Sequence, residues 1–210
     1  MKDFNSWLFD VPKYYFVPLF EVNEDLIVKT KLLGKKEKRT LVRNRKMEHA
    51  VIELVESNIE REDWDGLLYI MGKGERKSFV PYYIGKAGKK GVKHPISVNI
   101  ANIRTNKSKF ARWGDNVAYH IGDLSHVLFS FEAYKAQDNR YKDWAKVLFA
   151  HYDPPTLKEP VYLYLLPWYI GDIGINGKPC TLPILEKDLI SVASEYYKDT
   201  LLNVDGIYGR

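Results

Sequence analysis

The feature that most constrains the fold is a pair of short apolar runs, residues 66–71 (GLLYIM) and 79–84 (FVPYYI), which are joined by a polar loop. Both runs have the length and the aromatic and aliphatic content of strands, and glycines bound them, which is typical of a β-hairpin. On neighbouring antiparallel strands, Tyr69 and Tyr83 can project from one face and meet. Gly85 then allows a tight turn or the close approach of a ligand.

Helical periodicity predicts two longer elements elsewhere in the chain. Residues 44–60 carry apolar side chains at helical spacing, and Asn44 is of a type that caps helix N-termini. The strongest helix is expected over residues 183–202, which begin with Pro183. One face of this helix would carry Leu185, Leu189, Val192, Ala193 and Tyr196.

Weaker patterns complete the expected architecture. Residues 96–105 and 132–149 favour helices, residues 117–131 are strand-rich, and residues 161–170 favour a buried strand. Together these elements predict an α/β (α+β) fold. Its core is a small, mostly antiparallel three-stranded sheet that is flanked by helices.

Cysteine content and hydropathy exclude several classes of protein. The chain of 210 residues has one cysteine, Cys180, which excludes an internal disulfide and every cysteine-rich zinc module. No run of about 18 apolar residues occurs, so no membrane-spanning helix is expected. The N-terminus has acidic residues within its apolar stretch and lacks a small-residue cleavage site, unlike a signal peptide. We therefore expect a cytoplasmic protein.

The net charge of +5 conceals an asymmetry along the chain. Residues 1–114 contain 23 Lys/Arg and 14 Asp/Glu, whereas the remainder contains 9 and 13. Two basic stretches, residues 29–46 and 86–112, account for the excess, and they are either a phosphate-binding surface or a solvated face without a partner. The candidate DNA-binding residues are Lys35, Lys36, Lys38, Arg39, Arg43, Arg45, Lys89, Lys90, Lys93, Lys107 and Lys109.

A series of short motifs follows in a suggestive order. Tyr69 ends an LLY strand, Y-I-G follows at 83–85, arginines come next, Glu186 lies in LEKDLI, and Asn203 ends LLN. This order resembles the GIY-YIG nuclease superfamily, and the chain looks most like a restriction-endonuclease-like member. The first motif differs, because Leu67-Leu68 replaces Gly-Ile.

The resemblance implies a role for each matching residue. Tyr69 would be the general base or orient the attacking water, with Tyr83 beside it, and cations such as Lys86 would lower the tyrosine pKa. Glu186 would bind one Mg²⁺ (or Mn²⁺), which prefers oxygen ligands and keeps most of its waters. Arg112 or Arg104 would stabilise the phosphate, and Asn203 would support the site.

Each of these residues also has a simpler explanation. Tyr69 and Tyr83 can be packing residues of the hairpin, and Glu186 stands in a first helical turn, where acids are favoured in any case. His120, near Asp123, is a candidate for an alternative base or a DNA contact, or it is a hydrogen-bonded core histidine.

The resemblance predicts a Mg²⁺-dependent endonuclease that hydrolyses DNA phosphodiester bonds, of the type II restriction class. Residues 1–62 would be an N-terminal extension with a DNA-contacting arm and helix. Residues 63–210 would form the nuclease domain, with an insertion at about 115–158. The expected partner is double-stranded DNA, and a palindromic target would imply a homodimer. The alternative is a non-catalytic nucleic-acid-binding protein that uses the same basic surface.

Overall fold

The computed structural model of the chain describes residues 3–35, 37–112, 121–129 and 139–203. Lys36 and His120 lie outside these ranges. For Arg112 and Asp123 the backbone is described but the side chain is not.

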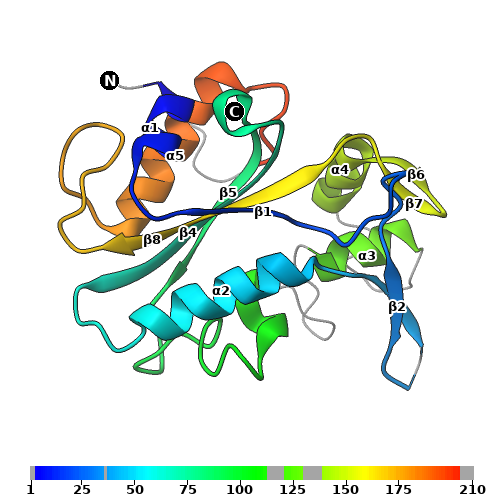
Figure 1. Ribbon diagram of the computed structural model, residues 1–210, viewed down its shortest axis with the longest axis horizontal. Coiled ribbons are helices and arrows are strands. Elements are labelled where there is room, and N and C mark those ends of the chain that lie inside the picture. The colour runs from blue at the N-terminus through cyan, green and yellow to red at the C-terminus, as the bar shows by residue number, and fades with distance from the viewer. Residues whose placement is uncertain (1–2, 36, 113–120, 130–138, 204–210) are drawn as a thin grey trace.

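A four-stranded antiparallel sheet forms the centre of the molecule (Figure 1). Its order is β1-β8-β4-β5, and the strands are β1 (Tyr15–Pro18), β8 (Val161–Tyr169), β4 (Trp64–Lys73) and β5 (Val80–Gly88). The α+β class is confirmed, but the prediction of three strands is wrong. The additional strand, β1, comes from the N-terminal segment and pairs with β8 from Tyr15 opposite Leu165 to Pro18 opposite Tyr162.

The predicted hairpin is confirmed as β4 and β5, with the short 3₁₀ helix η1 (Arg76–Ser78) in its loop. In its register Tyr69 lies opposite Gly85, and Met71 lies opposite Tyr83. The two tyrosines are therefore diagonal neighbours on one face, with ring centroids 6.2 Å apart. A diagonal pair at this distance is within the reach of aromatic side chains.

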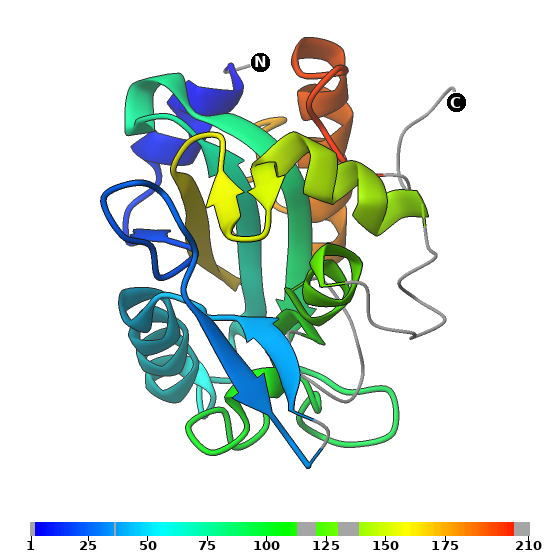
Figure 2. The ribbon, with the colours of Figure 1, turned by 90° about the vertical axis from the view of Figure 1, so that its right-hand side faces the viewer.

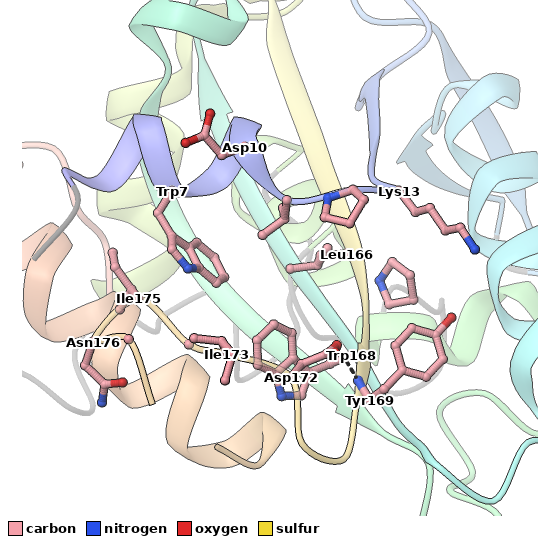
Figure 3. A pocket seen from close by; sticks show the side chains of 15 residues that line it. Trp7, Asp10, Lys13, Leu166, Trp168, Tyr169, Asp172, Ile173, Ile175 and Asn176 are labelled. Atoms are coloured by element: carbon pink, nitrogen blue, oxygen red, sulfur yellow. Dashed lines mark hydrogen bonds between the residues drawn. The ribbon is translucent and has the colours of Figure 1, made fainter. Parts of the chain in front are cut away.

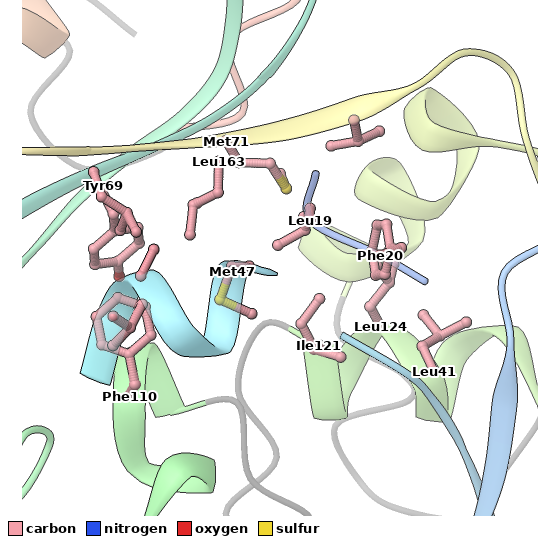
Figure 4. Close-up of a cluster of buried hydrophobic side chains, with 14 of the residues drawn as sticks. Leu19, Phe20, Leu41, Met47, Tyr69, Met71, Phe110, Ile121, Leu124 and Leu163 are labelled. Atoms are coloured by element: carbon pink, nitrogen blue, oxygen red, sulfur yellow. The ribbon is translucent and has the colours of Figure 1, made fainter. Parts of the chain in front are cut away.

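Helices cover both faces of the sheet. On one face lie α1 (Phe4–Asp10) and α5 (Leu182–Tyr196), and on the other lies α2 (Arg45–Asn58) (Figure 1). Because both faces are covered, β4 and β8 are almost continuously buried and read as apolar runs without alternation. In Figure 4 the α2-side core extends from Tyr69 and Phe110 through Met47 and Met71 to Leu124.

The helices predicted over 44–60 and 183–202 are confirmed, although α5 ends at Tyr196, six residues before the predicted end. Asn44 caps α2 by accepting a hydrogen bond from the Lys46 N–H at 2.9 Å. The buried face of α5 includes Leu185 and Leu189, as expected. Tyr196, however, ends the helix with 65% of its surface exposed, so its placement on the apolar face is wrong.

The structure differs from three of the weaker secondary-structure predictions or describes only part of the element. Helix α3 (Ile121–Leu128) replaces the expected strand, because Ile121, Leu124 and Leu128 are spaced for one buried helical face. Helix α4 (Asn139–Leu148) is the described part of the helix expected over 132–149. Residues 96–105 form turns instead of a helix, and Asn102 interrupts them with a φ of +51°.

Two small hairpins complete the structure. Strands β2 (Thr30–Leu33) and β3 (Lys38–Leu41) form a separate two-stranded sheet that extends from the body (Figure 2), and β6 (Phe149–Tyr152) pairs with β7 (Pro155–Leu157). A 3₁₀ helix, η2 (Lys107–Arg112), precedes α3. None of the described helices is both long enough and apolar enough to cross a membrane.

Candidate active site

A cleft of about 450 Å³ lies where the outer edge of β5 meets the start of α5. Four of the residues selected from the sequence motifs line it together: Tyr69, Tyr83, Lys86 and Glu186. They come from the β4–β5 hairpin and from α5, which lies about 90 residues further along the chain but packs beside the hairpin. The cleft is therefore the place where the predicted chemistry can be assembled.

Gly85 determines how Tyr69 reaches the cleft. A Cβ at position 85 would lie 2.6 Å from both Cζ and Oη of Tyr69, so the tyrosine ring crosses β5 directly over the glycine. Any larger residue would displace the ring. The Tyr69 ring is otherwise held by Phe110, with ring centroids 5.5 Å apart, while Tyr83 packs on Trp144 at 5.0 Å. These aromatic contacts fix the position of the Tyr69 hydroxyl.

The electrostatic surroundings of Tyr69 differ from the expectation. Burial, the neighbouring Tyr83 and the negative charge of Glu186 hold the Tyr69 pKa well above its ordinary value. The expected lowering by cations is therefore wrong, because the Lys86 ammonium is paired with Glu186 and the Tyr69 side chain is buried. Tyr69 is a protonated hydroxyl at neutral pH. It can orient a water or a phosphate oxygen, but it is a poor proton acceptor.

Lys86 and Glu186 form an ion pair across the cleft. The Lys86 side chain is 34% exposed and that of Glu186 is 16% exposed, so the pair is partly desolvated but accessible to a ligand. Glu186 owes its position to the start of α5. There Pro183 occupies the first turn, and the Asp65 carboxylate of β4 accepts a hydrogen bond from the Leu182 N–H at 2.7 Å.

Asn203 holds β5 from outside. Its Oδ1 accepts from the Ile84 N–H and its Nδ2 donates to the Ile84 carbonyl, both at 2.9 Å, and the Leu202 N–H donates to the Tyr82 carbonyl. The side chain is buried, at 6% exposure. Asn203 therefore covers the free edge of β5 at the centre of the Y-I-G motif. It lines no part of the cleft, so any contribution it makes is to position the strand.

The structure does not bring the candidate arginine Arg104 to the cleft. Its Nε donates to the Glu56 carboxylate of α2 at 2.9 Å, and its side chain is 68% exposed in a separate groove along that helix. The assignment of Arg104 to the phosphate site is therefore wrong in this structure. Arg112 ends η2 with an undescribed side chain, and His120 lies outside the described residues, so both stay predictions.

The candidate DNA-binding residues separate into partnered and unpartnered groups. Arg39 pairs with Asp153, and Arg43 and Lys107 both pair with Glu48. Lys89 donates to the Arg61 carbonyl, while Lys90 lines the cleft. The remaining described members are fully or partly exposed and have no ion pair: Lys35, Lys38, Arg45, Lys93 and Lys109.

The donor set of the cleft fits one divalent cation that keeps most of its waters. Glu186 offers a carboxylate, which the Lys86 ammonium occupies in this structure and which a metal ion would have to share or take over. A second carboxylate, Asp65, also lines the cleft, with one oxygen engaged by Leu182. Within the described ranges no group of three or more His, Cys, Asp or Glu forms a metal cage. This donor set suits Mg²⁺ better than a tightly held structural metal.

Three polar residues of the cleft were not selected from the sequence: Asp65, Ser97 and Asn99. Asp65 stands in an acidic segment that resembles a turn, but β4 begins at Trp64 and includes it. The sequence could have identified Asp65 as a candidate, because it is a carboxylate that stands just before the LLY strand. Ser97 and Asn99 lie among the turns that replace the helix expected over residues 96–105, so no local pattern marks them.

A second hollow, of about 700 Å³, lies between α1 and the loop that follows β8 (Figure 3). Its floor is apolar and includes the buried Trp7, Leu166 and Trp168, whereas Asp10 and Lys13 stand at its rim. It holds none of the residues selected from the sequence motifs.

Comparison of the chain with family models finds none that matches, and comparisons with curated proteins and with solved structures find no match either. The resemblance to GIY-YIG nucleases therefore rests on the sequence motifs alone.

Proposed function

We propose that the chain is a Mg²⁺-dependent endonuclease of the GIY-YIG type that hydrolyses phosphodiester bonds in DNA. The observation that carries this proposal is the convergence of Tyr69, Tyr83, Lys86 and Glu186 in one cleft. These residues provide hydroxyl donors, an ammonium and a carboxylate. Phosphodiester hydrolysis needs groups of this kind to orient a nucleophile and to stabilise negative charge.

Each side chain has a role that its surroundings support. The protonated Tyr69 hydroxyl, fixed over Gly85 and hydrogen-bonded with Tyr83, orients the attacking water or a phosphate oxygen. Lys86 stabilises the charge that develops on the phosphate. Glu186 would hold the Mg²⁺, which supplies a Lewis acid at the phosphate and acidifies a bound water. Asn203 keeps β5 in place for both Tyr83 and Lys86.

The finer features of the proposal follow from charge and from analogy. The basic stretches would attract the DNA backbone. The type II restriction class, a palindromic target, a homodimer and a cytoplasmic location belong to the same proposal, and they rest on analogy alone.

The second candidate is a non-catalytic nucleic-acid-binding protein. One observation favours it: no arginine is among the described residues that line the cleft. A cleft that lacks a bidentate phosphate ligand can bind DNA without cutting it.

One experiment separates the two candidates. Plasmid and phage DNA are incubated with the protein in Mg²⁺, in Mn²⁺ and in EDTA, alongside Glu186→Gln and Tyr69→Phe. Glu195→Gln is the matched control, because Glu195 is exposed on the same helix α5 and lies outside the cleft. Cleavage that needs metal, is lost in Glu186→Gln and persists in the control supports the nuclease. Binding without cleavage that Glu186→Gln leaves unchanged supports the second candidate.

A further inference from the structure

The β2–β3 hairpin stands apart from the rest of the molecule. It forms its own two-stranded sheet, with Thr30 opposite Leu41 and Leu33 opposite Lys38, and it extends from the body in Figure 2. An isolated two-stranded hairpin is at best marginally stable in water. A hairpin that protrudes in this way must therefore be held at its base.

Contacts at the base provide that anchor. The Leu41 N–H donates to the Ser125 hydroxyl of α3 at 3.2 Å. Arg39 donates to Thr30 across the hairpin at 3.2 Å and to Asp153 at 2.9 Å, and its guanidinium lies 4.5 Å from the centre of the Phe129 ring. These contacts hold the base of the hairpin against α3 and the β6–β7 turn. The outer part can then present side chains at a fixed position.

The outer part carries unpartnered basic residues and one exposed apolar residue. Lys31 and Lys35 are exposed, Lys38 is half-buried, and none of their side chains has an ion pair or hydrogen bond within the described residues. Leu32, between them on β2, is 61% exposed although it is a large aliphatic side chain. Glu37 is the one acidic residue between Thr30 and Leu41. Such a surface fits a polyanion that also offers apolar contacts.

Duplex DNA has both properties in its major groove, which admits a two-stranded β-ribbon. Phosphates flank that groove, and thymine methyl groups line its floor. We propose that the β2–β3 hairpin enters the major groove, that Lys31, Lys35 and Lys38 bind the flanking phosphates, and that Leu32 contacts base edges and contributes to sequence discrimination. This inference rests on the proposed function, because it takes duplex DNA as the substrate.

The test uses the full chain with Glu186→Gln, so that DNA is bound without being cut. Lys31→Gln, Lys35→Gln and Lys38→Gln are combined in one variant. The matched control combines Lys13→Gln, Lys77→Gln and Lys178→Gln, three exposed lysines on other elements. The measurement is the dependence of the binding constant on salt concentration. Each lost phosphate contact lowers the slope by about 0.9, so the hairpin variant should lose about 2 to 3.

A separate variant tests the apolar contact. Leu32→Ser keeps every charge and changes an exposed side chain, so it should fold normally. Selection from a pool of random duplexes should then give a broader set of bound sequences, with an unchanged salt slope.

The outcomes test the role of the hairpin separately from the proposed function. A wild-type protein that cuts DNA, together with hairpin variants that bind with the same slope and selectivity, overturns the role of the hairpin and leaves the nuclease intact. An equal loss of slope in the control triple also overturns it, because the effect is then one of net charge alone. A wild-type protein that neither binds nor cuts DNA overturns the proposed function itself. Binding of the hairpin to an acidic protein in place of DNA overturns the groove assignment.

Discussion

The cavity beside α1 and the cleft at β5 lie at opposite ends of one segment and differ in size and in the chemistry of their linings. Residues 172–177 line the cavity beside α1, and Leu182, Pro183 and Glu186 line the cleft at β5. The cavity is the larger, at about 700 Å³ against about 450 Å³. Size alone would select the cavity as the site, but the polar side chains converge in the cleft.

The origin of each hollow explains the difference. The cavity is a gap in packing: its floor joins Trp7 to Trp168, whose ring centroids are 6.1 Å apart, and the Trp168 indole N–H is already bonded to the Cys180 carbonyl. The cleft instead exists because Gly85 leaves room for a tyrosine to cross an edge strand. A hollow that can support catalysis is recognised by the groups that point into it and by the local structure that holds them there.

The largest effect is expected from Lys86→Met. Loss of the ammonium should reduce DNA cleavage on the order of 10²-fold to 10³-fold, because stabilisation of the developing charge is lost. Mn²⁺ should bind the variant at least as tightly, since no ammonium competes for Glu186. Cleavage rates and calorimetric titration with Mn²⁺ measure the two effects. Lys178→Met is the control, because Lys178 is exposed and lies outside the cleft. Loss of Mn²⁺ binding along with cleavage would show that Lys86 has only a structural role.

The next effect concerns the path of Tyr69. Gly85→Ala should displace the tyrosine ring, lower cleavage by about 10-fold to 100-fold, and destabilise the fold by about 1–3 kcal/mol through overpacking. Gly88→Ala is the matched control in the same strand, because a Cβ there would meet only the Asp65 carbonyl oxygen at 4.0 Å. Urea denaturation and cleavage rates provide the readouts. Equal behaviour of the two variants would contradict the close crossing.

Asn203→Ala should reduce the stability of the fold more than it reduces the rate of cleavage. The substitution leaves the buried N–H and carbonyl of Ile84 without their partners, which costs about 1–3 kcal/mol. The counterpart at the cavity is Asn176→Ala, which removes two exposed hydrogen bonds, one donated to Asp188 and one accepted from the Lys178 N–H, and should change stability by no more than about 0.5 kcal/mol. Denaturation midpoints compare the two directly. A neutral result at Asn203 would mean that water replaces its amide.

High pH distinguishes a tyrosine of the cleft from a tyrosine of the cavity. Burial raises the pKa of both Tyr69 and Tyr169, but Tyr69 is held well above the ordinary value, where the unfolded chain titrates at about 10. Below about pH 10 both states keep their protons. Above it the unfolded state loses protons first, so stability should fall as the pH rises.

The test is denaturation at pH 8, 9.5 and 10.5. Tyr69→Phe should flatten the fall in stability more than Tyr169→Phe does. A fall of the same steepness in both variants would contradict the difference in burial between the two hydroxyls.

The sequence could predict the features that depend on interactions between residues close together in the chain, and it could not predict those that depend on tertiary contacts. The β4–β5 hairpin and the Glu186 helix have local signals, namely strand-length apolar runs, glycines and helical periodicity. Packing of the helix against the hairpin brings the three cleft elements, β4, β5 and α5, together. Arg104 was misplaced because the spacing of Ile96, Ile100 and Ile103 predicts a helix, whereas residues 96–105 form turns, so the path of that segment depends on tertiary contacts. The aromatic and β-branched residues before Pro18 favour an edge strand, which β1 is, but four residues do not show that this strand joins the central sheet beside β8. The sign of the Tyr69 pKa shift depends on burial and on the pairing of Lys86 with Glu186, which only the folded chain reveals.

The smallest effect is expected at the larger hollow. Ile173 lines the cavity with 52% of its surface exposed, so Ile173→Ser removes little buried apolar area and should change stability by no more than about 0.5 kcal/mol. Cleavage should stay within about twofold of wild type, since that region supplies no group to the reaction. Rates on plasmid DNA and a thermal unfolding curve provide the measurement. A loss of cleavage comparable to that of Lys86→Met would reverse the ranking of the two hollows, because it would show that the apolar cavity, and not the convergent polar groups of the cleft, limits the reaction.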